Sequence, residues 1–491
     1  MSDAPLARMR SAISRGRTHE AAVAAEEVLL DDPSAPEARM LLGQLAERRG
    51  AIGKAARHFA HLATHPSYAV SSGSALVRAG LYEQSIAHFI QGMDAGDDPL
   101  GAALRLAWVF ERLDRFDDME ETLGSARALA QRQGRDVTVR EAILRARTKN
   151  WRSSLAILDK ATDLAGEDRL ARGRLRDRAR RYDEAWADFI GGKEEIAQQS
   201  RTYYPDESLA AHFTQLQACF SRSWPARIAE IASPTDNTEH PIFIAGAPRS
   251  GTTLIERHVG SDPTVATLGE LPCTFAMASE AARIEGGYPS GLSSLGASAL
   301  AAAAGKLRSA YLNCAKSRAA PLAKRRFTDK MPFNEQYLPL IALALPESPM
   351  IVVSRHPLDV IVSMMSHHMT HGHNCALSPL SAARHIAALD RLGDHWQTIG
   401  LHYHRVRYED FVTKRSTALN ELEKFAGLDL SHTAELAPGS TASTPSYGQV
   451  RERVHDRAIG RWRNYAPYLE SAAGIVAGAA ARHHYEPWQK A

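Results

Sequence analysis

A glycine- and serine-containing loop between an apolar run and an amphipathic run is the strongest chemical signal in the sequence. Residues 241–245 are apolar and β-favouring, 246–251 form the loop, and 252–259 have helical periodicity. A strand, a tight loop and a helix N-terminus in this order present backbone N–H groups and a positive dipole end to an anion. The predicted phosphate-binding residues are Pro248, Arg249, Ser250, Gly251, Thr252 and Thr253. The alternative is a structural turn that binds nothing.

The loop spacing is close to that of the nucleotide triphosphate loop, in which a lysine follows the second glycine. Thr252 stands in the place of that lysine. Because the lysine normally reaches the transferred phosphoryl group, ordinary ATP or GTP hydrolysis is disfavoured. The loop is therefore predicted to bind a phosphate-like group without the lysine that nucleotide triphosphate loops use.

A second strand-to-helix junction lies at residues 350–366. Its β-favouring residues end at Ser354, Arg355 follows at the predicted carboxyl end of the strand, and Ser363 comes about two helical turns later. Open α/β sheets bind ligands at this edge, so Arg355 and Ser363 are candidates for the same anion. Taken alone, the pair would more simply be a surface arginine and a helical serine.

Together, the two segments resemble the sulfotransferases that use 3′-phosphoadenosine 5′-phosphosulfate (PAPS). The loop at 248–253 looks like the 5′-phosphosulfate loop of that family, and Arg355 with Ser363 looks like its 3′-phosphate clamp. The resemblance covers roughly residues 235–490. It implies a P-loop-like, three-layer α/β domain with a mainly parallel sheet. It also implies PAPS as co-substrate, no metal, and sulfuryl transfer to an acceptor hydroxyl.

The tyrosylprotein sulfotransferases are the most similar members, and they place a glutamate base in a Gly-Glu pair shortly after the loop. Gly269-Glu270 fits that place, which implies that Glu270 accepts the hydroxyl proton. The alternative is that Glu270 caps a helix starting near Leu271. The segment 328–334 is similar to the Lys-x-Pro-Phe segment of the family, which implies that Lys330 neutralises charge on the leaving group. The alternative is a solvated lysine.

Three weaker assignments follow from the same resemblance. Tyr408, at the end of a predicted strand, would lie near the adenine and the 3′-phosphate. Ser446 lies in a Ser-x-x-Gln-Val segment similar to the closing loop of the family, where the serine contacts the phosphosulfate, and Arg451 follows it. For Ser446 and Arg451 a structural loop is an equal alternative. The candidate catalytic residues are thus Glu270, Lys330 and Ser446.

The sequence departs from the family pattern at two places. His367 stands where the tyrosylprotein enzymes have an arginine, and Arg453 replaces a proline near the closing loop. One 3′-phosphate contact is therefore expected to be weakened or pH-dependent. His367, His368, His371 and His373 also suggest a metal site. No carboxylate or cysteine pair joins them at ligand spacing, so we predict no metal.

The first 200 residues contain a repeat in which a bulky or apolar residue is followed three positions later by a mostly small one. The six pairs are Thr18/Ala21, Ile52/Ala55, Tyr82/Ser85, Phe116/Met119, Trp151/Ser154 and Tyr182/Ala185. Intervals of 30 to 35 residues and glycines before the first three pairs are typical of stacked helical hairpins. This part resembles the tetratricopeptide repeat, whose concave face usually binds peptide or protein. A generic helical bundle is the alternative.

The composition is that of an ordinary globular protein. The chain has 491 residues, and 59 Lys and Arg against 56 Asp and Glu give a formal charge of +3, which provides no general attraction to nucleic acid or anionic membranes. The four cysteines form no CxxC pair, the N-terminus lacks the apolar core of a signal peptide, and no run approaches the ~18 apolar residues that span a bilayer. We predict a cytoplasmic protein with no nucleic-acid partner and no membrane span.

The sequence as a whole predicts a multidomain protein of α plus α/β class. A tetratricopeptide-like helical solenoid is expected at 1–200, a helical linker at 201–240 in which 206–232 looks helical, and a sulfotransferase domain at 241–491. The repeats favour a peptide or protein acceptor, with tyrosine one candidate and a glycan, lipid or small phenol the others. A non-catalytic repeat scaffold with an inactive nucleotide-binding domain and a P-loop kinase-like enzyme are the alternative functions. The oligomeric state is not specified.

Overall fold

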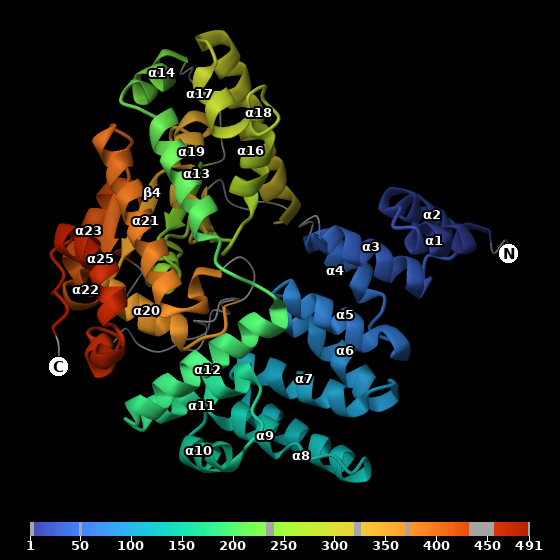
Figure 1. Ribbon diagram of the computed structural model, residues 1–491. Helices are drawn as coiled ribbons and strands as arrows, with labels where there is room; N and C mark the ends of the chain where they lie inside the picture. Colours follow the sequence, from blue (N-terminus) through green and yellow to red (C-terminus); the bar gives the residue numbers. More distant parts are fainter. Residues whose placement is uncertain are drawn as a thin grey trace. The chain divides into compact units, whose positions relative to one another are not determined.

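A computed structural model describes residues 4–48, 52–231, 240–318, 326–369, 374–431 and 456–489 (Figure 1). The chain divides into two compact units. The first comprises Met1–Ala161 and Lys316–Pro321, and the second comprises Thr162–Ala315 and Leu322–Ala491. In its described residues the first unit is helical, whereas the second contains a five-stranded sheet.

Helical hairpins build the first unit, and the paired residues of the sequence repeat mark them. The helices are α1 (Ala4–Ser14), α2 (Thr18–Asp31), α3 (Pro36–Arg48), α4 (Ile52–Ala60), α5 (Pro66–Arg78), α6 (Tyr82–Ala95), α7 (Pro99–Arg112), α8 (Phe116–Arg132), α9 (Thr138–Arg145) and α10 (Trp151–Lys160). The bulky or apolar member of each pair is the first residue of an even-numbered helix. The second members, Ala21, Ala55, Ser85, Met119 and Ser154, are at most 2% exposed, as close helix crossings require. The predicted helical N-terminal region is confirmed, and its tetratricopeptide identity stays a prediction.

A sixth hairpin of the same kind belongs to the second unit. Its helices are α11 (Gly166–Arg178) and α12 (Tyr182–Ser200). The last sequence pair begins α12. From this helix, Trp186 and Phe189 pack against Tyr465, with ring centroids 5.4 and 6.3 Å apart. The hairpin therefore shares a hydrophobic core with the C-terminal part of the chain.

The stretch predicted to be helical at 206–232 is helical over most of its length, and two helices share it. They are α13 (Asp206–Cys219) and α14 (Ser223–Ile231). Phe220 ends the first helix with an extended backbone, at φ −108° and ψ 101°. Pro225 lies in the first turn of the second helix, where the missing N–H has no helical partner to lose.

The sheet of the second unit is parallel and has β1 at its centre. Its strands are β1 (His240–Ala245), β2 (Val265–Thr267), β3 (Arg326–Lys330), β4 (Met350–Ser354) and β5 (His404–Arg407), in the order β2-β3-β1-β4-β5. Ile244 lies opposite Lys330 on one side and Ile351 on the other. All five strands thus end at one edge of the sheet. The chain crosses from one side of β1 to the other there, which is where open α/β sheets bind ligands.

Helices cover both faces of this sheet. They are α15 (Thr252–Val259), α16 (Cys273–Ala281), α17 (Leu292–Ser294), α18 (Ala297–Arg318), α19 (Leu338–Ala344), α20 (Pro357–Met365), α21 (Pro379–Thr398), α22 (Tyr408–Thr413), α23 (Arg415–Ala426) and α25 (Glu470–Arg482). Shorter turns are η1 (Gly287–Gly291), η2 (Asn334–Tyr337), η3 (Asn374–Leu377) and η5 (Arg461–Tyr468). Trp462 lies in the 3-10 helix η5 and is buried.

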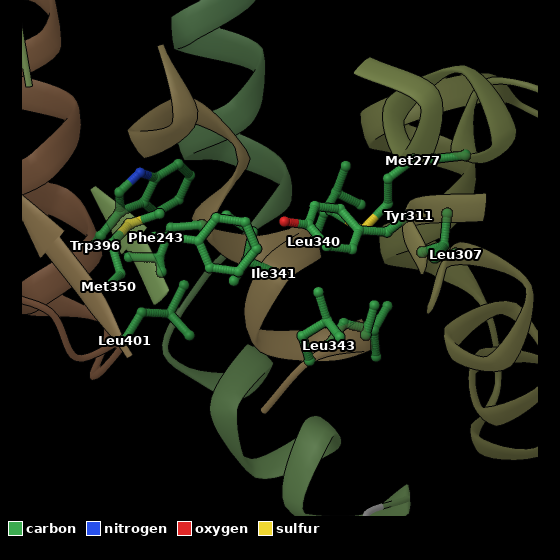
Figure 2. Close-up of a cluster of buried hydrophobic side chains, with 14 of the residues drawn as sticks. Phe243, Met277, Leu307, Tyr311, Leu340, Ile341, Leu343, Met350, Trp396 and Leu401 are labelled. Atoms are coloured by element: carbon green, nitrogen blue, oxygen red, sulfur yellow. The ribbon is translucent and has the colours of Figure 1, made fainter. Parts of the chain in front are cut away.

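Side chains of β1 alternate between two buried cores, as the period of a strand requires. Phe243 lies in the core that also contains Trp396 and Tyr311 (Figure 2). Ile242 and Ile244 lie in the other core, with Ile255 and Phe411 among their neighbours. Two helical layers around a parallel sheet confirm the predicted three-layer α/β architecture.

Candidate functional site

The loop after β1 is held so tightly that two of its positions accept only glycine. Gly246 has φ +136°, and a Cβ there would lie 2.3 Å from the carbonyl O of Val353 on β4. Gly251 has φ +107°, and a Cβ there would lie 2.6 Å from Cδ2 of Tyr408. Arg249 between them also has a positive φ of 73°. The loop therefore has one conformation, fixed by backbone and ring contacts.

Donors of this loop are available to an anion. Helix α15 begins at Thr252 without a side-chain hydrogen bond at its N-cap Gly251, so the positive end of its dipole lies at the loop. The Ser250 Oγ is buried and makes no hydrogen bond to the described residues, and the same holds for Nε of Arg355. Both residues line one small cavity beside Gly246. Buried donors without partners are destabilising unless a ligand or water satisfies them.

Arg249 connects the loop to helix α20. Its Nε donates to the Ser363 Oγ at 3.1 Å, and its Nη2 lies 3.3 Å from Nε2 of His367. Burial, and then the guanidinium groups of Arg355, Arg461 and Arg174, lower the pKa of Arg249 to about 9. Positive charge is thus concentrated where the loop meets Ser363, and an anion would be stabilised there.

Arg355 packs against the same loop from β4. Its Nη1 donates to the carbonyl O of Arg249 at 3.3 Å, and its guanidinium lies 4.8 Å from the centre of the Tyr408 ring. Tyr408 is the first residue of α22, and burial raises the pKa of its hydroxyl. The structure therefore brings together Arg249, Arg355, Ser363 and Tyr408, which the sequence predicted as cofactor-binding residues.

His367 is a neutral partner of Arg249. Its Nδ1 lies 3.0 Å from the carbonyl O of Ser363, which can only accept, so the ring proton is assigned to Nδ1. The opposite nitrogen then accepts from Arg249. Burial, together with Arg249 and Arg174, holds the pKa of His367 well below its usual value. His367 thus anchors Arg249 but adds no charge of its own.

Glu270 and Lys330 form an ion pair at the same edge of the sheet. The Lys330 Nζ donates to the Glu270 Oε1 at 2.7 Å, and the exposed fractions of the two side chains are 1% and 34%. Lys330 ends β3 next to the central strand, because the N–H of Met331 donates to the carbonyl O of Ile244 at 3.1 Å. Lys330 is therefore not a solvated lysine. Glu270 does not cap α16 either, since that helix begins at Cys273 without a side-chain cap.

Glu256 on α15 positions the turn before Glu270, and the sequence analysis gave it no role. Its Oε1 accepts from the N–H of Gly269 at 2.9 Å and from Oγ1 of Thr328 at 2.7 Å. It is buried, so these bonds are not shared with bulk water. The available signal was its place four residues after Thr252, on the helix face that also carries the loop.

Asp329, beside Lys330, is the second residue that sequence reasoning missed. It accepts from the hydroxyl of Tyr311 at 2.8 Å and from Nδ2 of Asn334 at 3.0 Å. Thr274 extends the network through a 2.7 Å bond to Oδ1 of Asn334. Burial raises the pKa of Asp329 to about 7. This network fixes the end of β3 and thereby the backbone position from which the Lys330 side chain extends.

Several predicted residues lie outside the described part of the chain. They are Ser446, Arg451, Arg453, His371 and His373. Among the residues with described positions, no three His, Cys, Asp or Glu side chains gather in a group suited to a metal ion. Within the same residues, every helix is too short or too polar to cross a bilayer.

Comparison with known proteins shows which family this part of the chain resembles. Residues 241–432 match the model of the "Sulfotransferase family". Over these residues the chain is similar to the sulfotransferase family. The match covers the loop, Glu270, Lys330, Arg355 and Tyr408.

The individual relatives of this chain are distant in sequence. It is 26% identical over 316 residues to an uncharacterized protein of Aquifex aeolicus (strain VF5), and it spans 39% of that relative's length with 60% of its own. Similar solved structures include the sulfotransferase domain of the olefin synthase of Synechococcus PCC 7002 (21% identity, 47% of this chain, 90% of that one, TM-score 0.34). Sulfotransferase STF9 from Mycobacterium avium is another (12% identity, 74% of this chain, 97% of that one, TM-score 0.30).

Proposed function

We propose that the chain transfers the sulfuryl group of PAPS to an acceptor hydroxyl. The observation that carries this proposal is the buried Lys330 paired with the partly exposed Glu270 at 2.7 Å, at the sheet edge where the glycine-bounded loop also lies. A base and a cation side by side next to an anion loop are what in-line transfer between two oxygens needs.

In the proposed reaction, Glu270 takes the proton of the acceptor hydroxyl as the hydroxyl oxygen attacks sulfur. The bond between sulfur and the bridging phosphate oxygen breaks, and 3′,5′-adenosine bisphosphate leaves with the electron pair. Lys330, which Glu270 holds in the apo site, is placed to offset the charge that develops on the bridging oxygen. The N–H groups and hydroxyls of residues 248–253 hold the 5′-phosphosulfate.

The other end of the nucleotide is assigned to the residues around Arg249. Arg355, Ser363 and Arg249 would hold the 3′-phosphate, because two guanidinium groups and a hydroxyl meet there. Tyr408, which packs on Gly251 and under Arg355, would border the adenosine. Ser446 and Arg451 remain proposed contacts of the phosphosulfate.

Two features oppose the alternative functions. Thr252 in place of the P-loop lysine disfavours a kinase-like use of ATP. A domain that had become only a scaffold would gain nothing from keeping Lys330 buried beside Glu270, since a buried ion pair is weak support for stability. The proposed acceptor is a peptide or protein that the helical hairpins of the first unit bind. The proposed location is the cytoplasm.

The first test is calorimetric titration of the full chain with 3′,5′-adenosine bisphosphate, AMP and ATP. Wild type should prefer the bisphosphate, and Arg355→Ala and Ser363→Ala should lose that preference. Arg283→Ala is the matched control, because Arg283 is 78% exposed and pairs with Glu280 away from the loop. Equal binding of AMP and the bisphosphate by wild type would contradict the PAPS assignment.

The second test addresses the chemistry. Labelled PAPS is incubated with hydroxyl acceptors of each class: tyrosine peptides, glycans, lipids and phenols. Glu270→Gln should retain binding of the bisphosphate and lose transfer by about 100-fold or more, since removing a positioned base has effects of this size. Transfer at the wild-type rate by Glu270→Gln would remove Glu270 from the mechanism.

A further inference from the structure

The hairpin α11–α12 reaches the helix that carries Ser363. Lys193 on α12 donates from Nζ to the carbonyl O of His367 at 2.7 Å. Arg174 on α11 donates from Nη1 to the carbonyl O of Ser366 at 2.9 Å. These carbonyls lie at the C-terminal end of α20, where cationic donors satisfy the last acceptors and oppose the negative dipole end. The hairpin thus holds the helix end to which Arg249 is anchored.

The same two side chains bring positive charge close to Arg249. Lys193 is 3% exposed, and burial, with further contributions from Arg249 and Arg174, lowers its pKa to about 7. The charge of Arg174 contributes to the lowered pKa of both Arg249 and His367. Buried like charges destabilise one another, and an anion bound among them reverses the sign of that interaction.

Helix α11 also contacts the C-terminal turn at residues 460–462. Asp177 accepts from Nη2 of Arg461 at 3.1 Å. On α20, Asp359 accepts from the backbone N–H groups of Gly460 and Trp462 at 2.7 and 2.8 Å. The turn at residues 460–462 is therefore held both by α11, through Asp177, and by α20, through Asp359.

We propose that Arg174 and Lys193 are positioning residues for the 3′-phosphate, which makes the α11–α12 hairpin part of the nucleotide site. They hold the end of α20, so that Ser363 and His367 keep Arg249 in place. Arg174 also supplies the positive charge that the neutral His367 does not. This inference rests on the proposed function, because the ligand concerned is the 3′-phosphate of the PAPS nucleotide.

The test compares 3′,5′-adenosine bisphosphate with AMP, which lacks the 3′-phosphate, by calorimetry on the full chain. Arg174→Gln should weaken binding of the bisphosphate about tenfold and leave AMP within about twofold, since a charge-assisted interaction has effects of this size. Arg174→Lys, which keeps the charge, should recover most of the loss. Arg169→Gln is the matched control, because it removes an arginine of the same helix that pairs with Glu195 at 3.9 Å.

The outcomes separate this inference from the proposed function. If wild type does not prefer the bisphosphate over AMP, the proposed function fails and the inference fails with it. If wild type shows the preference and Arg174→Gln keeps it in full, only the inference is overturned. Equal weakening of both nucleotides by Arg174→Gln would show a merely structural role and would also overturn it.

Hydrogen exchange on the wild-type chain tests the inference without a variant, in case Arg174→Gln does not fold. The bisphosphate should slow exchange in peptides covering 357–367 and also in peptides covering 170–178 and 190–196. AMP should slow exchange around the loop after β1 but not in the hairpin. Protection by the bisphosphate that is confined to residues after 240 would overturn the proposal.

Discussion

Gly246→Ala tests whether the loop after β1 is as tightly fixed as the structure indicates. At φ +136° an L-residue is strained, and this strain alone costs about 1–3 kcal/mol. The added Cβ would lie 2.3 Å from the carbonyl O of Val353, whereas ordinary van der Waals contacts begin at 3.4 Å. The atom it meets is backbone in a neighbouring strand, so relief requires β1 and β4 to move apart by about 1 Å.

The strain and the overlap together give an expected loss of at least about 3 kcal/mol in the free energy of unfolding. Gly427→Ala is the matched control, because Gly427 also has a positive φ, +59°, but a Cβ there would meet nothing within 4 Å. The control gives the cost of an L-residue in the left-handed region, which we expect to be about 1 kcal/mol. The difference between the two variants measures the overlap together with the additional strain of φ +136°.

The assay is urea unfolding followed by tryptophan fluorescence. Of the seven tryptophans, Trp186, Trp224, Trp396, Trp462 and Trp488 lie in the second compact unit, so this signal reports mainly on that unit. Binding of 3′,5′-adenosine bisphosphate is measured in parallel and should be lost in Gly246→Ala but kept in Gly427→Ala. Equal stability of the two variants would refute the account of the loop.

Three further outcomes are expected. Asp329 has a pKa of about 7 against an ordinary value of 3.8, so the folded chain holds a proton that the unfolded chain releases between about pH 4 and 7. The free energy of unfolding therefore falls as pH rises through that window, and Asp329→Asn should make it less dependent on pH when measured by urea unfolding. The same pH dependence in wild type and Asp329→Asn would contradict this prediction. Glu256→Ala leaves the buried Thr328 hydroxyl and the half-buried Gly269 N–H without this acceptor and should cost about 2 kcal/mol or more, whereas Glu256→Gln should cost less than about 1 kcal/mol in the same assay. The sulfur atoms of Cys273 and Cys314 lie 2.7 Å apart, so a thiol oxidant should link these two, and peptide mass spectrometry that finds Cys219 linked instead would contradict this.

Features confined to a short stretch of sequence were predicted well. The strand, loop and helix around Arg249 follow from an apolar run, two glycines and helical periodicity within 241–259. The starts of α6, α8 and α12 coincide with Tyr82, Phe116 and Tyr182, because a bulky residue at that place is repeated in each hairpin. Local signals of this kind do not depend on how distant segments meet.

The helical stretch predicted at 206–232 shows what local reasoning does not resolve. Apolar residues at helical spacing continue past the break, so the periodicity alone predicts one element. Pro225 was compatible with a helix start as well as with an interrupted helix, and the extended Phe220 decides between the two. The backbone of one residue is not visible in a pattern of hydrophobicity.

Partners separated by many residues were not predictable from the sequence. The roles of Glu256 and Asp329 depend on which way a buried side chain faces, and their partners Thr328 and Tyr311 come from other elements. Likewise, nothing local to Lys193 indicates that its ammonium group meets the carbonyl of His367, 174 positions along the chain. Such contacts follow from packing of whole elements, which one sequence does not specify.

The substitution at His367 illustrates why a motif and its environment must be considered together. By position, a histidine in place of an arginine predicts a weaker phosphate contact. In the structure, the His367 imidazole is a neutral acceptor that holds Arg249 without cancelling its charge. Arg174, from helix α11, donates to the carbonyl O of the neighbouring Ser366. At the opposite end of the loop, Lys330 is instead paired with the carboxylate of Glu270. In the proposed reaction, the unneutralised charge of Arg249 would bind the 3′-phosphate, and Lys330 would be released from Glu270 when substrate binds, as binding and catalysis separately require.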